Sequence, residues 1–337
     1  MKILLLTPSP TRMHMGGIAT VTRYRDGLQA RGHLCELFGS TEDGGLKQSL
    51  EGTLGRFRPD IVHAHDACRT GVQLLGLRAP WVVSVGGEDL WQDMVDDERG
   101  PLVCEVMKRA GRVLVPTPAA GTAVEERVPD AVGKIDVVPR TARRLDTKGT
   151  DLRRSLGIPR QRFVIFLPGG IRPIKGQHRA VAVVGLLRAA GADVELIIAG
   201  PEQDAGYAEQ LRTACQRQPG IRLLPPLAAD RMGAAYCDAD VVLNTSLSEG
   251  ASPTILEAGM LGRAIVAADV PGNRELLRHN ETGLLFATED DMARQILALY
   301  RNRSAAGALG VRVREDFQRR FDADREISAL LSAYAAA

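Results

Sequence analysis

Short runs of apolar residues alternate with longer amphipathic stretches along most of this chain. In the first half, five runs have the length and apolar content of buried strands: KILLLTP, CELFG, IVHAH, WVVSVGG and VLVPT. Amphipathic stretches at residues 21–31 and 102–110 predict helices between them, and Gly32 stands where a helix C-cap belongs. This alternation predicts a parallel, doubly wound sheet.

The same alternation of apolar runs and amphipathic stretches starts again after Gly149. Six further apolar runs predict strands: FVIFLPG, VELIIAGP, IRLLPP, DVVLNTS, AIVAADV and TGLLF. Amphipathic stretches at 179–189, 207–218, 231–237 and 254–261 predict the helices that connect them. The restart therefore indicates an α/β protein with two doubly wound, Rossmann-like domains.

A polar stretch, ARRLDTKGTDLRRSLGIPR, separates the two sets of runs and has no strand pattern. It predicts a linker near residues 141–152. We expect a first domain at 1–145, a second at 152–315, and a helical segment at 316–337 that packs back on the first domain. Two facing domains of this kind leave a cleft, in which ligands meet the carboxyl ends of both sheets.

The first predicted strand is followed by Gly16 and Gly17, just before a helix. Two glycines allow a phosphate or sugar to approach the backbone, and the helix N-terminus offers N–H groups to an anion. The spacing is not the GxGxxG dinucleotide motif, which disfavours hydride chemistry. A simple turn is the alternative explanation for the glycine pair.

The strand IVHAH places His63 and His65 on one face, with Asp66 directly after it. His65 and Asp66 stand at the strand end, so we expect them to line the cleft. Two histidines and Cys68 are also zinc-ligand types, but no distant partner completes a known ligand spacing. Buried structural histidines remain the other alternative.

The next strand ends in VGGED. Gly86 and Gly87 allow close approach of a ligand, and Glu88 and Asp89 are candidates for contact with an acceptor substrate. Asp89 is also suited to N-cap the helix that follows, and this structural role is the favoured one.

The first strand of the second half runs into Gly169 and Gly170, followed by Arg172 and Lys175. The order of residues is not that of a Walker loop. A strand end with two glycines and two nearby cations nevertheless suits a diphosphate, since arginine offers a fork of donors and lysine a point charge. Surface cations on a loop are the alternative.

The stretch TSLSEGASPTILEAGMLG holds two glutamates, Glu249 and Glu257, between two predicted strands. Pro253 suits a first helical turn and Ser252 an N-cap, so Glu249 lies in the loop and Glu257 about one turn into the helix. The backbone N–H groups of 250–252 are then placed to bind a phosphate of a ligand, and the two glutamate carboxylates to accept its hydroxyls. A capped helix with two solvated glutamates is the alternative.

Composition narrows the class of protein only a little. The 337 residues are 45% hydrophobic and carry 43 Lys plus Arg against 41 Asp plus Glu, which suits two globular domains and gives no sign of nucleic acid binding. A basic cluster is the local exception, and its members are Arg140, Arg143, Arg144, Arg153 and Arg154. Such a cluster contacts phosphates or an anionic membrane surface, or is a solvated face between domains.

The five cysteines are odd in number and form no CxxC pair, which favours a reducing, cytoplasmic location. The apolar start of the chain stops before Pro8 and fits a buried strand better than a signal peptide. No apolar run approaches the length of a membrane span, so membrane association is not indicated. Oligomeric state is left open.

The pattern E-G-x-S-x-x-x-L-E-A, from Glu249 to Ala258, resembles the motif of retaining GT-B glycosyltransferases of the glycogen synthase and sucrose synthase type, family 4. Other segments agree in order: HAHD, GGIRPIKG, IAGP, DADVVLNTSLSEG and VPGNRELLRHNETGLLF. The resemblance covers nearly the whole chain and is stronger in the second half. It implies the GT-B fold, with two Rossmann-like domains across a cleft and a C-terminal helix that crosses back.

The resemblance also implies roles for single residues. Arg172 and Lys175 would neutralise the donor diphosphate, and Glu249 would bind the sugar hydroxyls. Further donor contacts would come from Gly16, Gly17, Gly170, Gly250, Ala251 and Ser252, with Glu257 on the ribose and Pro201 and Leu224 near the base.

This chain departs from the family pattern in two places. Many relatives have His-Gly where this chain has Gly86 and Gly87, and that histidine meets the sugar. Its loss leaves the role to His65 or removes the contact, and it leaves room for an acceptor that needs little deprotonation, such as a thiol, selenol or phosphate. Arg172 and Lys175 are also unusually close in sequence. A branch similar to the animal glycosyltransferase 1 domain-containing protein shares both features.

The reaction that the resemblance implies is retaining transfer from a nucleotide diphosphate sugar, UDP-sugar above all, to a small-molecule or glycan acceptor, without metal or other cofactor. Two alternatives remain: a GT-B sugar-nucleotide epimerase, which acts without an acceptor, and a non-catalytic nucleotide-sugar-binding protein. A metal-dependent GT-A enzyme using Asp238 and Asp240 is disfavoured, because these residues stand at the start of a strand.

Overall fold

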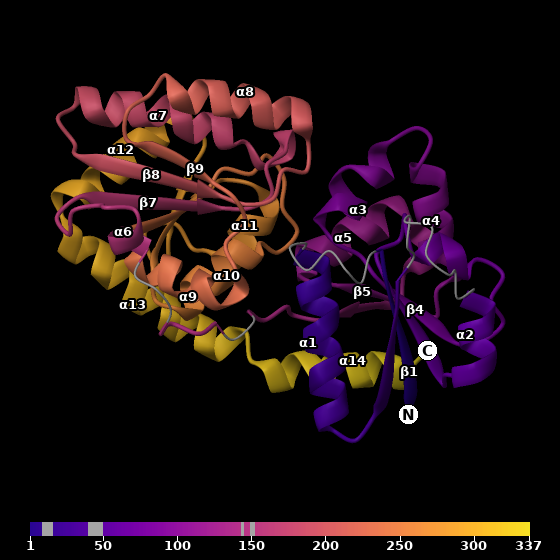
Figure 1. The fold of residues 1–337 in the computed structure, drawn as a ribbon. Coiled ribbons are helices and arrows are strands. Elements are labelled where there is room, and N and C mark those ends of the chain that lie inside the picture. Colours follow the sequence, from indigo (N-terminus) through magenta and orange to yellow (C-terminus); the bar gives the residue numbers. More distant parts are fainter. Residues whose placement is uncertain (9–15, 40–49, 143–144, 149–151) are drawn as a thin grey trace. The chain divides into compact units, whose positions relative to one another are not determined.

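The computed structural model describes residues 1–8, 16–39, 50–142, 145–148 and 152–337. The chain forms two compact units (Figure 1). Unit 1 contains residues Met1–Arg143 and Phe321–Ala337, and unit 2 contains Arg144–Arg320.

Unit 1 is built on a parallel sheet in the order β2-β1-β3-β4-β5-β6. Its strands are β1 (Lys2–Thr7), β2 (Leu34–Gly39), β3 (Ile61–His65), β4 (Trp81–Ser84), β5 (Arg112–Val115) and β6 (Ile135–Val137). The five strands predicted from apolar runs are confirmed, whereas β6 was not predicted. Strand order reverses between β1 and β3, as in a doubly wound sheet.

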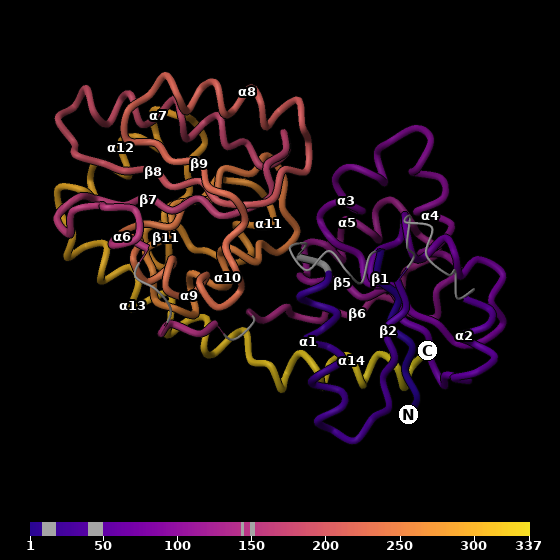
Figure 2. Tube along the Cα trace, viewed as in Figure 1, coloured from indigo at the N-terminus to yellow at the C-terminus, as the bar shows by residue number. Residues whose placement is uncertain are grey.

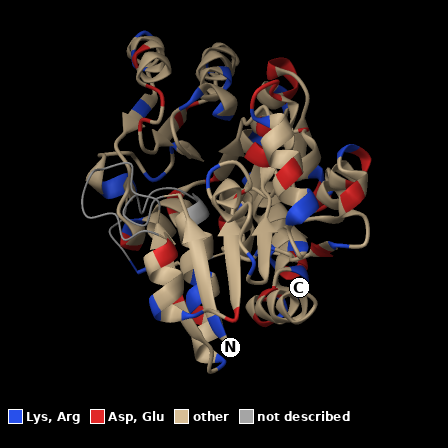
Figure 3. Cartoon of the chain, turned by 90° about the vertical axis from the view of Figure 1, so that its right-hand side faces the viewer, with Lys and Arg blue, Asp and Glu red and all other residues tan. Residues whose placement is uncertain are grey.

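Alternation along β1 sends its side chains to both faces of this sheet. Ile3 and Leu5 pack with residues of α1 (Gly16–Ala30) and α14 (Ala323–Ala335). Leu4 and Leu6 pack on the other face, with residues of α4 (Gly100–Arg109) and α5 (Pro118–Arg127). The shorter helices are α2 (Leu50–Phe57), α3 (Gly87–Trp91), η1 (Gly71–Leu74), η2 (Asp93–Val95) and η3 (Pro129–Ala131). Charged side chains lie mainly on helices and connections, and the strands are largely free of them (Figure 3).

Unit 2 has a second parallel sheet, in the order β12-β11-β10-β7-β8-β9. Its strands are β7 (Phe163–Pro168), β8 (Val194–Ala199), β9 (Ile221–Leu224), β10 (Val241–Asn244), β11 (Ala264–Ala268) and β12 (Leu284–Phe286). All six predicted strands of this half are confirmed.

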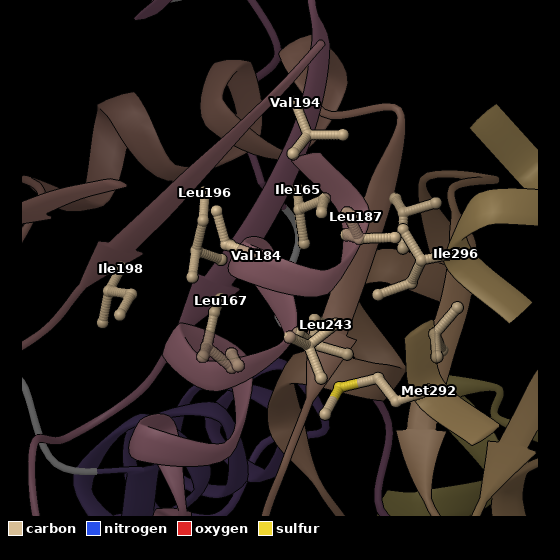
Figure 4. Packing of buried hydrophobic residues seen from close by; sticks show 14 of the residues in the cluster. Ile165, Leu167, Val184, Leu187, Val194, Leu196, Ile198, Leu243, Met292 and Ile296 are labelled. Atoms are coloured by element: carbon tan, nitrogen blue, oxygen red, sulfur yellow. The ribbon is translucent and has the colours of Figure 1, made fainter. Parts of the chain in front are cut away.

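The helices of unit 2 cover both faces of its sheet (Figure 1). They are α6 (Leu152–Ser155), η4 (Pro173–Lys175), α7 (Gln177–Ala189), α8 (Ala205–Gln216), α9 (Ala229–Asp238), α10 (Pro253–Met260), α11 (Pro271–Leu276), α12 (Glu289–Arg301) and α13 (Arg303–Arg320). Ile165 and Leu167 of β7 pack against Leu187 of α7 and Met292 of α12 (Figure 4). Burying each such side chain contributes about 1.5–3 kcal/mol. No helix in the described ranges is long and apolar enough to cross a membrane.

The last segment of the chain returns to unit 1, where both termini lie (Figure 2). Residues 316–337 were expected to form one helix, but α13 ends at Arg320 and α14 starts after Asp322, whose side chain accepts the N–H of Arg325. Glu326 of α14 is fully buried, and its carboxylate accepts hydrogen bonds from both Nε and Nη2 of Arg23 at 2.7 Å. This pair fastens α14 to α1.

Candidate functional site

The carboxyl ends of β7 and β8 approach each other closely in unit 2. A Cβ added to Gly200, after β8, would lie 1.9 Å from the carbonyl oxygen of Gly169, so only glycine fits. The carbonyl of Gly170 accepts a hydrogen bond from Gln177 Nε2 at 2.8 Å, and that of Pro201 accepts the Ile171 N–H at 2.8 Å. The predicted positions Gly170 and Pro201 thus lie in one network of backbone bonds.

The cation-bearing turn η4 is tied to the loop that follows β10. Thr245 Oγ1 donates to the Lys175 carbonyl at 2.7 Å, and the Leu247 N–H donates to the Ile174 carbonyl at 2.8 Å. Gly176 closes this turn with φ of +60°, and a Cβ there would lie 2.5 Å from the Thr245 carbonyl oxygen. Arg172 precedes the turn in extended conformation. The two loops therefore form one rigid edge.

Lys175 and Glu249 form an ion pair at this edge. Lys175 Nζ lies 2.6 Å from Glu249 Oε1, with the lysine side chain 22% and the glutamate side chain 8% exposed. The same carboxylate oxygen accepts Ser246 Oγ at 2.6 Å and Asn244 Nδ2 at 3.2 Å. Burial alone would raise the pKa of Glu249, but the charge of Lys175 and these hydrogen bonds outweigh it and lower that pKa. Glu249 is therefore ionised.

Two buried asparagines that the sequence reasoning missed hold this loop together. Asn244 ends β10, and its Nδ2 also donates to Ser252 Oγ at 3.0 Å. Its Oδ1 accepts Asn273 Nδ2 at 3.1 Å, and Asn273 is fully buried. A Cβ at the neighbouring Gly272 would lie 2.1 Å from the Glu249 carbonyl oxygen. A polar residue ending an apolar strand was the only signal that could have identified Asn244.

The start of α10 has the predicted N-cap position and first turn, at Ser252 and Pro253. The Ser252 side chain, however, makes no capping bond, because its Oγ accepts from Asn244 instead. In the described part of the chain, no acceptor receives the backbone N–H of Gly250, Ala251 or Ser252. Such N–H groups at a helix start favour an anion.

Glu257 lies inside α10 and is buried at 9% exposure, which rules out a solvated helix face. Its Oε2 accepts the Tyr236 hydroxyl at 2.8 Å, and the Tyr236 ring lies edge-on to Phe166 at 5.4 Å between centroids. Leu224, at the end of β9, is half-buried. The predicted contacts of Glu257 with ribose and of Leu224 with a base stay predictions.

The two histidines of β3 in unit 1 have different surroundings. His63 is satisfied on both ring nitrogens, with Tyr334 Oη at 2.7 Å from Nδ1 and Ser84 Oγ at 2.7 Å from Nε2, and burial lowers its pKa to about 3. His63 is thus a structural histidine. His65 is 7% exposed, and its Nδ1 has no hydrogen-bond partner among the described residues.

Asp89 lies in the first turn of α3, and its side chain accepts a backbone N–H at the start of that helix. The helix begins at Gly87, so the prediction that Asp89 is the N-cap was wrong: Gly86 takes that position. Asp89 Oδ2 accepts the Gly86 N–H and Oδ1 the Ala67 N–H, both at 2.8 Å. Burial, and then the charge of Asp66, raise its pKa to about 7. Asp89 joins the loops after β3 and β4.

The other predicted polar residues of this edge are engaged with neighbouring groups. Asp66 accepts the N–H groups of Arg69 and Thr70 at 2.6 and 3.1 Å, and Glu88 pairs with Arg69 at 3.0 Å. Gly16 and Gly17 form the first turn of α1, and the loop before them, residues 9–15, lies outside the described residues. Their proposed contact with a donor stays a prediction.

Asp238 and Asp240 have structural partners at the amino end of β10. Asp238 accepts the Leu152 N–H at 2.5 Å, and Asp240 pairs with Arg153 at 2.6 Å. Both aspartates thus stand just before β10, away from its carboxyl end, as the sequence predicted. Of the basic cluster, Arg153 is therefore engaged, and Arg143 and Arg144 lie outside the described residues. Among the residues that the structure describes, no three His, Cys, Asp or Glu side chains could hold a metal ion.

The two doubly wound units, each with a six-stranded parallel sheet, have the GT-B fold. Solved structures agree. Anabaena HepE in complex with UDP and glucose superposes with a TM-score of 0.81 at 19% identity, covering 100% of both chains. Sucrose-phosphate synthase from Thermosynechococcus elongatus has a TM-score of 0.86 at 17% identity, covering 99% of this chain and 98% of that one.

Sequence comparisons show what unit 2 and the whole chain are similar to. Residues 162–302 match the family model Glycosyl transferases group 1. Glycosyltransferase 1 domain-containing protein 1 of Xenopus tropicalis is 27% identical over 299 residues, 86% of this chain and 85% of that protein. The D-inositol 3-phosphate glycosyltransferase of Salinispora tropica is 29% identical over 193 residues, which span 54% of this chain and 40% of that protein.

Proposed function

We propose that this protein transfers a sugar from a nucleotide diphosphate sugar, with UDP as the nucleotide, to a small-molecule or glycan acceptor. The buried Lys175–Glu249 pair beside the uncapped start of α10 is the observation that carries this proposal. The UDP and glucose bound to the structurally similar HepE support the choice of donor. All five cysteines are free thiols, in keeping with a cytoplasmic enzyme.

Lys175 and Arg172 neutralise the diphosphate in this proposal, together with the N–H groups of 250–252. Glu249 orients the ammonium of Lys175 and accepts hydroxyls of the sugar on its remaining lone pairs. Glu257, held by Tyr236, accepts the ribose hydroxyls. Pro201 and Leu224 border the base.

The reaction proceeds with retention and without a metal. The acceptor attacks the anomeric carbon from the face of the leaving group, while the bond from that carbon to the β-phosphate oxygen breaks. The acceptor proton passes to an oxygen of the departing diphosphate, and the negative charge that develops there is stabilised by the cations and N–H groups already in position. No covalent enzyme intermediate forms. His65, in the other unit, is the candidate polar contact on the acceptor side.

A thermal-shift screen of UDP-, GDP-, ADP- and dTDP-sugars tests the donor. A true donor at about 100 times its dissociation constant stabilises the protein by about 2.7 kcal/mol. Product analysis follows, with the preferred donor and an acceptor library, and the anomeric configuration is assigned by NMR. Conversion of donor alone to an epimer would replace transfer by epimerisation, and binding without turnover of any acceptor would leave a sugar-nucleotide-binding protein.

A further inference from the structure

Arg140 lies at the carboxyl edge of the unit 1 sheet, shortly after β6. A Cβ built on Gly86, at the end of β4, would be 3.5 Å from Arg140 Nη2. A side chain at position 86 would therefore contact the guanidinium. These two residues are far apart in sequence, and β6 itself was not predicted, so no sequence pattern pointed to the pair.

The guanidinium of Arg140 has no carboxylate within ion-pair distance anywhere in the described ranges. Its charge acts on two buried neighbours instead. Burial lowers the pKa of His65, and the positive charge of Arg140 lowers it further. Burial raises the pKa of Tyr24 to about 12, and the charge of Arg140 opposes that rise. By contrast, Arg23 and Arg69 on this edge form ion pairs with glutamates. Arg140 thus retains its capacity to bind an anion.

The backbone beside Arg140 is fixed by the returning C-terminal segment. The Thr141 N–H donates to Glu326 at 3.1 Å, and Thr141 Oγ1 donates to the Phe321 carbonyl at 2.6 Å, both buried. Glu326 is in turn held by two bonds from Arg23. This anchoring presets the position of Arg140, which lowers the entropic cost of binding a ligand.

His65 supplies a second polar group at the same place. It is more than nine-tenths buried, its Nδ1 has no partner among the described residues, and its ring is 6.0 Å from that of Tyr24. Buried polar atoms are normally satisfied, so an orphaned ring nitrogen calls for a ligand or an ordered water. Its depressed pKa keeps this imidazole neutral.

We propose that Arg140 and His65 bind an anionic group of the acceptor, a phosphate or a carboxylate, beside Gly86. A guanidinium fork matches the oxygens of either group in a bidentate manner. Asp89, whose Oδ2 would lie 3.9 Å from a Cβ built on Gly86, has both oxygens on backbone N–H groups, which offset its charge. This inference rests on the proposed transferase function, because it assigns unit 1 to the acceptor.

Arginine labelling with phenylglyoxal, followed by peptide mass spectrometry of the full chain, tests the site directly. Inorganic phosphate and acetate serve as probes, and exposed Arg78, before β4 at the opposite edge, is the internal reference. We expect one of the two anions to slow labelling of Arg140 several-fold and to leave that of Arg78 unchanged, and the protecting anion identifies the acceptor group. Equal labelling rates of Arg140 with and without both anions would overturn the proposal.

Variants separate this inference from the proposed function. Arg140→Met should lower the affinity of the protein for the protecting anion by about 10- to 150-fold, the equivalent of one charged hydrogen bond. Arg78→Met should leave that affinity unchanged. Arg140→Met should keep the thermal shift with the donor and lose transfer. If this variant loses the donor shift too, the assignment of Arg140 to the acceptor is wrong. If no nucleotide sugar binds the wild type but phosphate still protects Arg140, the proposed function fails and the anion site stands.

Discussion

Replacing Lys175 by Met removes the partner of a buried carboxylate, and the structure sets the size of the effect. Glu249 is 8% exposed, so it loses the countercharge at 2.6 Å and keeps two neutral donors, Ser246 and Asn244. Leaving a buried charge without its partner costs about 3–5 kcal/mol, and the remaining donors bring the estimate to about 3 kcal/mol at pH 7. Glu249→Gln leaves a 22% exposed ammonium that water can solvate, at a cost of about 1 kcal/mol.

The pH dependence follows from the sign of the pKa shift of Glu249. In the wild type this pKa is lowered below its ordinary value of 4.5, so the pair stabilises the protein above about pH 4.5 and that contribution is lost as the pH falls through the folded pKa. In Lys175→Met only burial and two neutral donors act, so the pKa of Glu249 rises above 4.5. The variant then regains stability as the pH falls from 7, and the difference from wild type shrinks.

Urea unfolding followed by far-UV circular dichroism at pH 7 and pH 5 measures both effects. Lys148→Met is the matched control, since Lys148 is an exposed lysine of the same unit and should behave as wild type. A Lys175→Met midpoint equal to that of Lys148→Met, or a loss no larger than that of Glu249→Gln, would refute the reasoning. So would a stability difference that grows between pH 7 and pH 5.

Two further predictions concern a turn and a histidine. Gly176→Ala should lower the free energy of unfolding by about 1–3 kcal/mol more than Gly191→Ala does. Both glycines have positive φ, but only at Gly176 would the new Cβ lie 2.5 Å from a carbonyl oxygen, that of Thr245. Equal urea midpoints of the two variants would contradict this. Because burial lowers the pKa of His63 from 6.5 to about 3, His63 alone should cost unit 1 about 1.4 kcal/mol per pH unit as the pH falls below 6.5 toward that pKa. His63→Gln should show a shallower loss by tryptophan fluorescence, and an unchanged slope would count against the assignment.

Most of the fold could be predicted because parallel strands buried on both faces are continuous apolar runs. β7 is of this kind, and β8 departs from it only at Glu195; every residue in both strands is buried. The strand that escaped prediction, β6, has three residues, IDV, none of them fully buried. It lies at the edge of its sheet, where its periodicity is too short to separate from a loop.

The candidate site was predictable only where one loop contains its parts. Glu249, Ser252 and Glu257 share a single stretch, and the structure places them around the start of α10. Their supports come from other elements: Tyr236, the partner of Glu257, precedes β10, and Asn273, which binds Asn244, follows β11. Such pairings depend on tertiary packing, which local sequence patterns do not encode. The same holds for the approach of Arg140 to Gly86.

Calorimetric titration of wild type and Lys175→Met with UDP tests the central claim most directly, with GDP, ADP and dTDP as parallel titrants. We predict one binding site per chain for one of these nucleotides, with an affinity that falls about 10- to 150-fold in Lys175→Met, the equivalent of one charged hydrogen bond, and stays unchanged in Lys148→Met. Binding of equal affinity to wild type and Lys175→Met, or no binding of any of the four nucleotides to the wild type, would contradict the account.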